Sequence, residues 1–393
     1  KTPSIRFKGF TDPWEQRKVS EVSEIVAGGT PSTSVSEYWE PKEVPWLSSG
    51  EVHKKYITYT DDMISKNGLA NSSAKIIKKN SVLIALAGQG KTRGTVAINR
   101  ISLSTNQSIA AMSFNDDIVP EFVFSNLENR YDEIRAMSSG DGSRGGLNKQ
   151  LVGDITIPYT IKEEQQKIGQ YFSNLDHLIT LHQRKYNKLL NVKKSMLEKM
   201  FPKNGSNIPE IRFKGFTDPW EQRKVFEIAD RFDNLRVPVA ANLRIPGNTP
   251  YYGANGIQDY VEGYTHDGEY ILVAEDGASD LKNYPVNYVN GRIWVNNHAH
   301  VLQGKEKIAN NKFLSYAMRL ADIESVLVGG GRAKLNADIM MNLDIAIPSF
   351  NEQEQIGAYF SNLDNLITLH QREWKGKRLW IIINCLLNTI KNG

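Results

Sequence analysis

The stretch Ile5–Val19, IRFKGFTDPWEQRKV, decides the organisation of this chain, because Ile211–Val225 repeats the same fifteen letters 206 positions later. A second repeat follows each copy: Ile168–Arg184 (IGQYFSNLDHLITLHQR) returns as Ile356–Arg372 with two differences, at an offset of 188. Between these matched segments the two halves diverge. We call the matched segments the frame and the segments between them the inserts. Sequence drift after a duplication should change the frame as much as the inserts. A nearly identical frame around two unlike inserts therefore indicates that the two halves perform two versions of one task.

Composition sets the class of protein. The chain has 393 residues, which favours two or three domains, and 40% hydrophobic with 23% charged residues permits a packed core and excludes wholesale disorder. No apolar run approaches the roughly 18–20 residues of a membrane span. The opening Lys1-Thr2-Pro3 lacks an apolar secretory core, and Cys385 is the single cysteine, so we expect a cytoplasmic protein. A net charge of +4 permits an anionic partner.

The second repeat opens a long predicted helix in each half. Over Glu163–Met200 apolar residues recur every seven positions, in series that start at Ile168, Tyr171 and Phe172. Such a helix, about 57 Å long, cannot bury its apolar stripe alone. The two helices could therefore pair antiparallel and hold the inserts a fixed distance apart. The predicted spacer positions are Ile168, Phe172, Leu175, Ile179, Ile356, Phe360, Leu363 and Ile367.

The inserts read as mixed α/β structure. Short β-rich runs at Ser81–Ala87, Gly94–Asn99, Glu269–Ala274 and Arg292–Asn296 are broken by Gly, Asn and Ser turns, and helix-like stretches cover Pro120–Ala136 and Asn311–Ser325. The predicted fold class is α/β (α+β), with two globular domains in a pseudo-two-fold arrangement separated by two long antiparallel coiled-coil helices. The predicted boundaries are 1–162 and 204–350 for the domains, and 163–203 and 351–393 for the helices.

Several catalytic signatures are approached but incomplete. Gly90-Lys91-Thr92 resembles part of a phosphate-binding P-loop, but the glycine required five positions earlier is Ala85. Gly140–Gly145 fits GxGxxG yet follows a helix-like stretch instead of a strand. His266, His298 and His300 have no acidic or thiol partner at metal-ligand spacing, which favours hydrogen-bonding roles. We therefore predict no catalytic residue, no metal site and no cofactor in this chain.

A larger set of segments carries a family resemblance. Gly28–Ser32 (GGTPS), Pro45–Val52 (PWLSSGEV), Tyr251–Val261 (YYGANGIQDYV) and Trp294–Leu302 (WVNNHAHVL) occur in order with the duplicated frame. Together they resemble the specificity subunit of type I restriction–modification systems, over essentially the whole chain.

The resemblance implies a division of labour. Each insert would be a target recognition domain that reads one half of a bipartite double-stranded DNA target. The frame helices would set the gap and bind two modification (methyltransferase) subunits, which carry S-adenosylmethionine and methylate adenine. Separate restriction (translocase/nuclease) subunits would use ATP and Mg. This chain would be a non-catalytic subunit of the complex.

The candidate DNA contacts are polar loop residues and cations of the inserts, which could bind phosphates or read base edges. In the first insert they are Thr30, Ser32, Ser48, Ser49, Lys91, Arg93 and Arg144. In the second they are Tyr251, Tyr252, Asn255, Asn297, His298, Arg332 and Lys334.

The second long helix departs from the first after Arg372. Lys377 and Asn384 stand where the first copy has Leu189 and Met196, and Gly376 weakens a helix by roughly 1 kcal/mol relative to Ala. The distal end of this helix could be shortened, or its apolar stretch could pack elsewhere.

Two other classes of function remain open from sequence. One is a duplicated protein–protein adaptor without DNA readout, which salt-independent or absent DNA binding would favour. The other is a stand-alone DNA methyltransferase or nuclease, which the absent catalytic motifs oppose.

Overall fold

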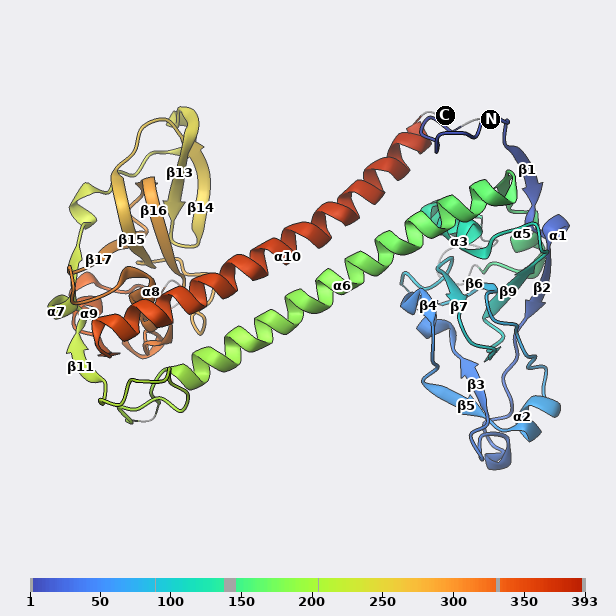
Figure 1. Cartoon of the computed structure of the whole chain (residues 1–393), viewed down its shortest axis with the longest axis horizontal. Helices are drawn as coiled ribbons and strands as arrows, with labels where there is room; N and C mark the ends of the chain where they lie inside the picture. Colours follow the sequence, from blue (N-terminus) through green and yellow to red (C-terminus); the bar gives the residue numbers. More distant parts are fainter. Residues whose placement is uncertain (1–2, 89, 138–145, 204, 330–332, 391–393) are drawn as a thin grey trace. The chain divides into compact units, whose positions relative to one another are not determined.

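The computed structural model describes residues 3–88, 90–137, 146–203, 205–329 and 333–390, with side-chain surroundings up to Gly376. Two compact units are present, Lys1–Leu181 together with Trp374–Gly393, and His182–Glu373 (Figure 1). Each long helix contributes one part to each unit, whereas the sequence placed domain boundaries at the helix ends. Along the first long helix, Ile168 packs against the core of one unit, and Leu189 and Met196 pack against the core of the other.

The first unit is built on two small sheets. The larger has the strand order β2-β9-β6-β7-β4, and the smaller has the order β5-β3-β8. Every residue of β6 and β7 is buried, which explains their continuous apolar sequences. The strands are β2 (Ser23–Ala27), β3 (Val44–Leu47), β4 (Tyr56–Ile57), β5 (Asp62–Ile64), β6 (Val82–Ala85), β7 (Val96–Asn99), β8 (Ser104–Thr105) and β9 (Ile109–Phe114).

Short helices cover the first unit's sheet. The helix-like stretch predicted over Pro120–Ala136 is two helices, because the backbone leaves helical geometry at Arg130. Phe122, Val123, Phe124 and Leu127 of the first of these pack into the core below the sheet. The helices are α1 (Val19–Val22), α2 (Lys66–Ala70), α3 (Pro120–Asn129), α4 (Tyr131–Ala136) and α5 (Lys149–Asp154).

The second unit has a different sheet, with the strand order β12-β17-β15-β16-β13-β14. The predicted strands at Glu269–Ala274 and Arg292–Asn296 are the ends of longer strands, and the predicted helix Asn311–Ser325 ends at Leu320. The strands are β12 (Ala229–Arg231), β13 (Pro246–Gly253), β14 (Gly256–Val261), β15 (His266–Ala274), β16 (Val286–Val295) and β17 (Ala299–Gly304). The helices are α7 (Val225–Ile228), α8 (Asn311–Leu320) and α9 (Ala337–Met341).

The repeated frame forms the same two-stranded antiparallel sheet in both units. In the first, β1 (Glu15–Lys18) pairs with β10 (Thr156–Tyr159). In the second, β11 (Glu221–Lys224) pairs with β18 (Asp344–Ile347). Each pair brings the beginning and the end of an insert together.

The two long helices are α6 (Lys162–Met200) and α10 (Phe350–Ile390). Inside the second unit, Leu189 and Met196 of α6 pack on a core that includes Ile356 and Phe360 of α10. Lys193 of α6 contacts Asp364 of α10, and His182 contacts His370, so residue numbers rise along one helix as they fall along the other. The predicted antiparallel pairing is confirmed for this part of the chain.

The far end of α10 answers one question left open by the sequence. The helix continues through Gly376 to Ile390, so the expectation that it could be shortened is wrong. A single glycine in a helix costs only about 1 kcal/mol, which a long run of helical hydrogen bonds tolerates. The side chains at Lys377 and Asn384 lie outside the described surroundings.

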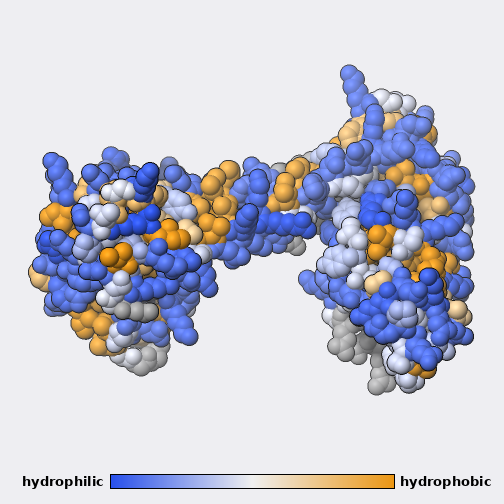
Figure 2. Space-filling model, turned by 60° about the horizontal axis from the view of Figure 1, so that its bottom comes forward, coloured by the Kyte–Doolittle hydropathy of each residue, from blue (hydrophilic) through white to orange (hydrophobic). Residues whose placement is uncertain are grey.

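The face of the protein in Figure 2 is mainly hydrophilic, with apolar side chains scattered between charged ones. None of the helices in the described parts of the chain combines the length and hydrophobicity that a membrane span requires.

Candidate nucleic-acid interface

In the first unit, the structure brings GGTPS and PWLSSGEV together. GGTPS follows β2, and PWLSSGEV begins inside β3. The ends of both strands lie beside residues 104–107: Gly29 N donates to the Thr105 carbonyl at 2.8 Å, and Asn106 N donates to the Leu47 carbonyl at 3.0 Å. A Cβ on Gly28 would lie 2.2 Å from the Asn106 carbonyl oxygen, so this close approach requires glycine. The two loops therefore contact the same short segment, residues 105–107, although Thr30 and Ser48 are 18 positions apart in sequence.

The hydroxyl groups of these loops already have local partners. Thr30 hydrogen-bonds the Gln107 side chain, and Ser32 Oγ lies 2.8 Å from Ser34 Oγ. Ser48 Oγ donates to Glu51 at 3.3 Å and caps the 3₁₀ turn that begins at Ser49. These contacts order the loops, while Ser32 remains exposed and Ser48 and Ser49 are half-buried.

Two of the predicted cations of the first unit lie in a loop at the end of the larger sheet where β2 also ends. Lys91 and Arg93 lie in the connection between β6 and β7, and Ala85 at its start pairs with Ile109, the first residue of β9. Tyr131 of α4 donates to the Lys91 carbonyl at 3.1 Å. Lys91 is exposed and Arg93 half-buried. Arg144 lies outside the described residues.

In the second unit, the two tyrosines have unequal exposure. Tyr251 is 1% exposed, and its hydroxyl accepts a hydrogen bond from Val239 N at 2.9 Å. The Arg244 guanidinium lies over its ring at 4.1 Å from the centroid. A base contact by the Tyr251 side chain would need this packing to open. Tyr252 is half-buried, and burial raises the pKa of its hydroxyl.

Asn255 sits at the exposed turn between β13 and β14. Its side-chain amide donates to the Gly277 carbonyl at 2.9 Å and its oxygen accepts from Ser279 N at 2.8 Å. The side chain therefore ties this turn to the loop that follows β15, and that loop also carries Asp276.

Three more predicted residues gather around the end of β15. Lys334 Nζ lies 3.0 Å from Glu275 Oε1, and His298 Nδ1 lies 2.5 Å from Asp276 Oδ1. Glu275 N also donates to the His298 carbonyl at 2.9 Å. Asn297, next to His298, is exposed. Arg332 lies outside the described residues. The structure thus brings Asn255, Asn297, His298 and Lys334 to one edge.

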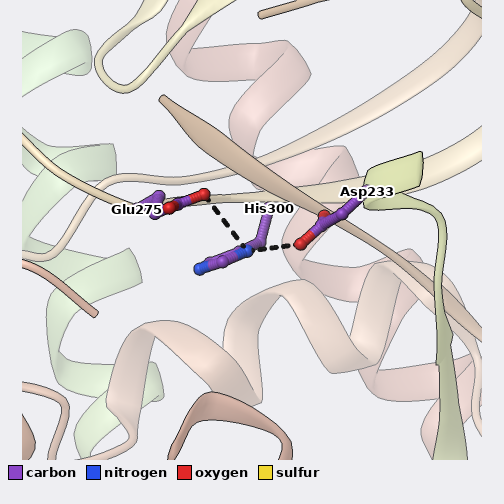
Figure 3. A group of neighbouring side chains, drawn as sticks. All are labelled: Asp233, Glu275 and His300. Carbon is purple, nitrogen blue, oxygen red and sulfur yellow. Dashed lines mark hydrogen bonds and ion pairs between the residues drawn. The ribbon is translucent and has the colours of Figure 1, made fainter. Parts of the chain in front are cut away.

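Beneath this edge lies an ion-pair network that sequence reasoning missed (Figure 3). His300 is 1% exposed; its Nδ1 lies 2.6 Å from Asp233 and its Nε2 lies 2.9 Å from the Leu335 carbonyl. Since both ring nitrogens face oxygen acceptors, both contacts are satisfied only when the ring carries two protons. Arg236 donates to Glu275 at 2.6 Å and to the Ala299 carbonyl at 2.9 Å.

Carboxylate pKa values in the network follow from these contacts. Burial alone would raise the pKa of Asp233, but the hydrogen bond and charge of His300 hold it below its ordinary value. The pKa of Glu275 is also lowered, because the hydrogen bonds of Arg236 and Lys334 outweigh its burial. Asp233, Glu275 and His300 are close enough to hold a metal ion. Their ligand atoms are already neutralised by the chain's own cations, so the arrangement acts as a brace.

All three histidines make hydrogen bonds. His266 Nε2 lies 3.1 Å from the Phe232 carbonyl, and burial lowers the pKa of its ring. The sequence shows no acidic partner at metal-ligand spacing, but the fold places Asp276 beside His298, and Asp233 and Glu275 beside His300. The missed partners, Asp233 and Arg236, lie more than 60 positions before His300 in sequence, and no local spacing signals such a contact.

The predicted spacer positions differ between the two helices. Ile356, Phe360, Leu363 and Ile367 of α10 are all buried in the second unit's core or at its edge. In α6, Ile168 packs against the first unit's core, while Phe172, Leu175 and Ile179 are half-buried. The α10 positions therefore serve packing within this chain.

The chain contains two unlike mixed α/β domains. Each domain is closed by a copy of the same strand pair and followed by a copy of the same long helix. This arrangement defines a class of duplicated proteins in which a constant frame carries variable inserts. The sequence matches the family described as type I restriction modification DNA specificity domain over residues 11–191 and 217–375. The chain belongs to this family.

Relatives and a solved structure agree with the family match. A putative type I restriction enzyme specificity subunit of Haemophilus influenzae, S.HindORF215P, is 44% identical over 154 residues, 39% of each chain. The MjaVIII specificity subunit of Methanocaldococcus jannaschii is 20% identical over 399 residues, which cover 92% of this chain and 88% of that protein. The type I restriction-modification S subunit from M. genitalium shares the fold with a TM-score of 0.70 at 13% identity, covering 98% of both chains. For three curated relatives, the match spans only 39–41% of their length.

Proposed function

We propose that the chain is the non-catalytic DNA-specificity subunit of a type I restriction–modification complex. Each unit reads one half of a bipartite DNA target. The observation that carries the proposal is the family match over both halves, joined to a frame that is nearly constant around two inserts with different sheets. A constant frame suits a constant partner, and different inserts suit different half-sites.

The proposed DNA-facing edges carry two kinds of group. Exposed Lys91 in the first unit and Lys334 in the second are suited to phosphate contacts, which add affinity without reading sequence. Ser32 and Asn297, which are exposed beside them, are suited to hydrogen bonds with base edges. Arg93, Arg144 and Arg332 complete the proposed set.

The partners follow from the family. Two modification subunits carry S-adenosylmethionine and dock along α6 and α10, and restriction subunits with ATP and Mg join the complex. Exposed cations on α6, among them Arg184, Lys185 and Lys188, offer a polar face for this docking, because the apolar positions of α10 are used inside the chain.

The decisive experiment is base-resolution mapping of adenine methylation in host DNA with the gene intact and deleted. Loss of one split motif, two short half-sites around a fixed gap, is the expected result. Retention of every methylated motif, with modification subunits shown to be expressed, would contradict the proposal.

A chimaera assigns each half-site to its unit. Replacing residues 226–343 by the corresponding insert of a relative with a known target should change one half-site and leave the other half-site and the gap unchanged. A change in both half-sites would contradict independent reading by the two units. Salt-independent DNA binding by the assembled complex would favour the adaptor alternative.

A further inference from the structure

Two histidines of the repeated LITLHQR segment meet in the second unit. His182 on α6 and His370 on α10 occupy the same repeat position, 188 residues apart. Their Nδ1 atoms lie 3.0 Å apart, and the ring centroids are 5.2 Å apart with planes at 43°. The two helices run antiparallel there, so the two equivalent histidines face each other across the helix pair.

The protons on this pair are constrained by Glu373. His182 Nε2 lies 3.1 Å from a Glu373 carboxylate oxygen, which can only accept a hydrogen bond when ionised. His182 therefore donates through Nε2, and its Nδ1 presents a lone pair toward His370. One proton is shared between the two Nδ1 atoms. If this proton moves from Nδ1 to Nε2 of His370, two nitrogen lone pairs converge.

We propose that His182 and His370 form a two-histidine binding site for a divalent transition-metal ion, with Glu373 as the positioning residue. Neutral imidazole nitrogen is a preferred ligand of Zn²⁺, Cu²⁺ and Ni²⁺. Tetrahedral coordination at Zn–N distances of about 2.0–2.1 Å places two nitrogens about 3.3 Å apart, so the rings need to separate by only a few tenths of an ångström. The ion takes the place of the shared proton, which moves to Nε2 of His370 as that ring changes tautomer, and water fills the remaining positions.

Glu373 strengthens the argument because ligand histidines usually donate their other N–H to a carboxylate, which fixes the tautomer and raises ligand basicity. The corresponding residue of the first copy is Lys185, so the frame is asymmetric at this position. The carboxylate lies one helical turn beyond His370 and reaches across to His182.

The acidic group at Asp233, Glu275 and His300 is a weaker candidate for the same ions. Its carboxylates contact Arg236 at 2.6 Å and Lys334 at 3.0 Å, and both His300 nitrogens are engaged. A metal ion there has to displace two of the chain's own cations. At the histidine pair it requires only that one proton move from Nδ1 to Nε2 of His370.

Titration of the purified full-length chain with Zn²⁺ tests the proposal, with Mg²⁺ as the hard-cation control. Zn²⁺ should bind at one ion per chain by calorimetry and raise the thermal midpoint, because it bridges the two helices only in the folded state. Mg²⁺ should do neither. Substituting Co²⁺ should give the visible absorption of a nitrogen-ligated site.

The variants separate this site from ordinary surface histidines. H182Q and H370Q should each weaken Zn²⁺ binding at least tenfold, while H177N should not change it. His177 is exposed on α6, and the second copy has Asn365 at its position, which makes H177N a matched control. E373Q should weaken binding by about 10–100-fold, and it keeps the test decisive if a histidine variant does not fold.

Four results would overturn the proposal: no Zn²⁺ binding by the wild-type chain, unchanged affinity in both H182Q and H370Q, unchanged affinity in E373Q, or loss of binding in H300Q with retention in H182Q. The last result would place the ion at the acidic group. None of these readouts depends on DNA recognition, so the test stands apart from the proposed function.

Discussion

Glu164 and Glu352 hold the same place in the two copies of the frame, yet their surroundings differ. Both are fully buried and each receives two parallel hydrogen bonds from an arginine, at 2.6 and 2.7 Å from Arg6 and at 2.7 and 2.7 Å from Arg212. Glu164 also accepts from Trp14 at 3.0 Å and from Thr160 at 2.6 Å. In the second unit, Pro348 replaces that threonine.

The matching tryptophans show the consequence. Trp220 is 2% exposed, and within the described parts of the chain its ring nitrogen has no hydrogen-bond partner. Its ring instead packs edge-on against Phe201 and Phe313. An identical fifteen-residue segment therefore anchors one unit through a polar network and the other through a larger aromatic cluster. The bidentate arginine–glutamate ion pair is the anchor that both units share, whereas the contacts around the tryptophan differ between the two units.

The largest expected effect comes from breaking that shared anchor. E164Q and E352Q each remove a fully buried charge and leave an arginine whose side chain is only 10% or 12% exposed without its counter-charge, so each should destabilise its own unit by about 3 kcal/mol or more. Hydrogen exchange followed by mass spectrometry locates the loss by unit. E163N, an exposed neighbour changed to the residue that the second copy carries at position 351, is the control and should have little effect. Equal destabilisation of both units by either variant would contradict separate anchoring.

The ion-pair brace under the second unit's edge should make the stability of the second unit more sensitive to acid than that of the first unit. Because the pKa of Asp233 is lowered in the folded state, its contribution is complete above the ordinary aspartate range and is lost as pH falls through the lowered value. H300Q should remove about 1.5–3 kcal/mol at neutral pH, and the further loss on acidification should be smaller than in wild type, because the hydrogen bond and charge that lower the pKa of Asp233 are gone. Exchange rates in the second unit, measured from about pH 6 to about pH 3, check this. First-unit rates serve as the internal control.

A smaller difference is expected between the tryptophans. W14F removes a hydrogen bond to a buried carboxylate, whereas W220F removes a donor without a partner. W14F should therefore cost about 1–2 kcal/mol more than W220F, after similar losses of ring area. Denaturant unfolding of both variants measures the difference. A larger cost for W220F would mean that aromatic packing outweighs the polar network.

The smallest effect concerns the long helices. A Cβ on Gly376 meets nothing within 4 Å, so G376A should stabilise α10 by up to about 1 kcal/mol. G357A is the contrasting variant, because its Cβ would lie 2.9 Å from the Asn310 side chain and 3.0 Å from Phe313 N, and it should destabilise. Thermal midpoints of the two variants should shift in opposite directions.

Sequence predicted the frame better than the inserts. The seven-residue series starting at Ile168 predicted α6 to within one residue of its start, and the β-rich runs predicted at Ser81–Ala87 and Gly94–Asn99 contain the strands β6 and β7. The strands β13 and β14 were not predicted, because Gly and Pro interrupt β13 and four consecutive residues of β14 are exposed. This hairpin joins the sheet through the parallel pairing of β13 with β16, a long-range contact that local patterns do not encode.

For the candidate interface, residue type and loop position placed Thr30 and Ser48 on segments that the fold brings together. The brace of Asp233, Arg236, Glu275 and His300 could not be predicted, since its members come from separate turns and strand ends. Burial also changes the interpretation of Tyr251, whose sequence surroundings resemble those of an exposed loop. Exposure depends on what packs above a residue, and the sequence near that residue does not contain this information.

The strand pairs β1–β10 and β11–β18 have a consequence for how such a gene can change. Lys18 pairs with Thr156 and Lys224 pairs with Asp344, so each insert leaves and returns at neighbouring points on the frame. The length and strand order of each insert can therefore vary without disturbing the frame, as long as the two ends of the insert stay adjacent. A single exchange of the coding sequence between these two points can therefore replace a complete insert, while the arginine–glutamate ion pair that anchors the frame is kept.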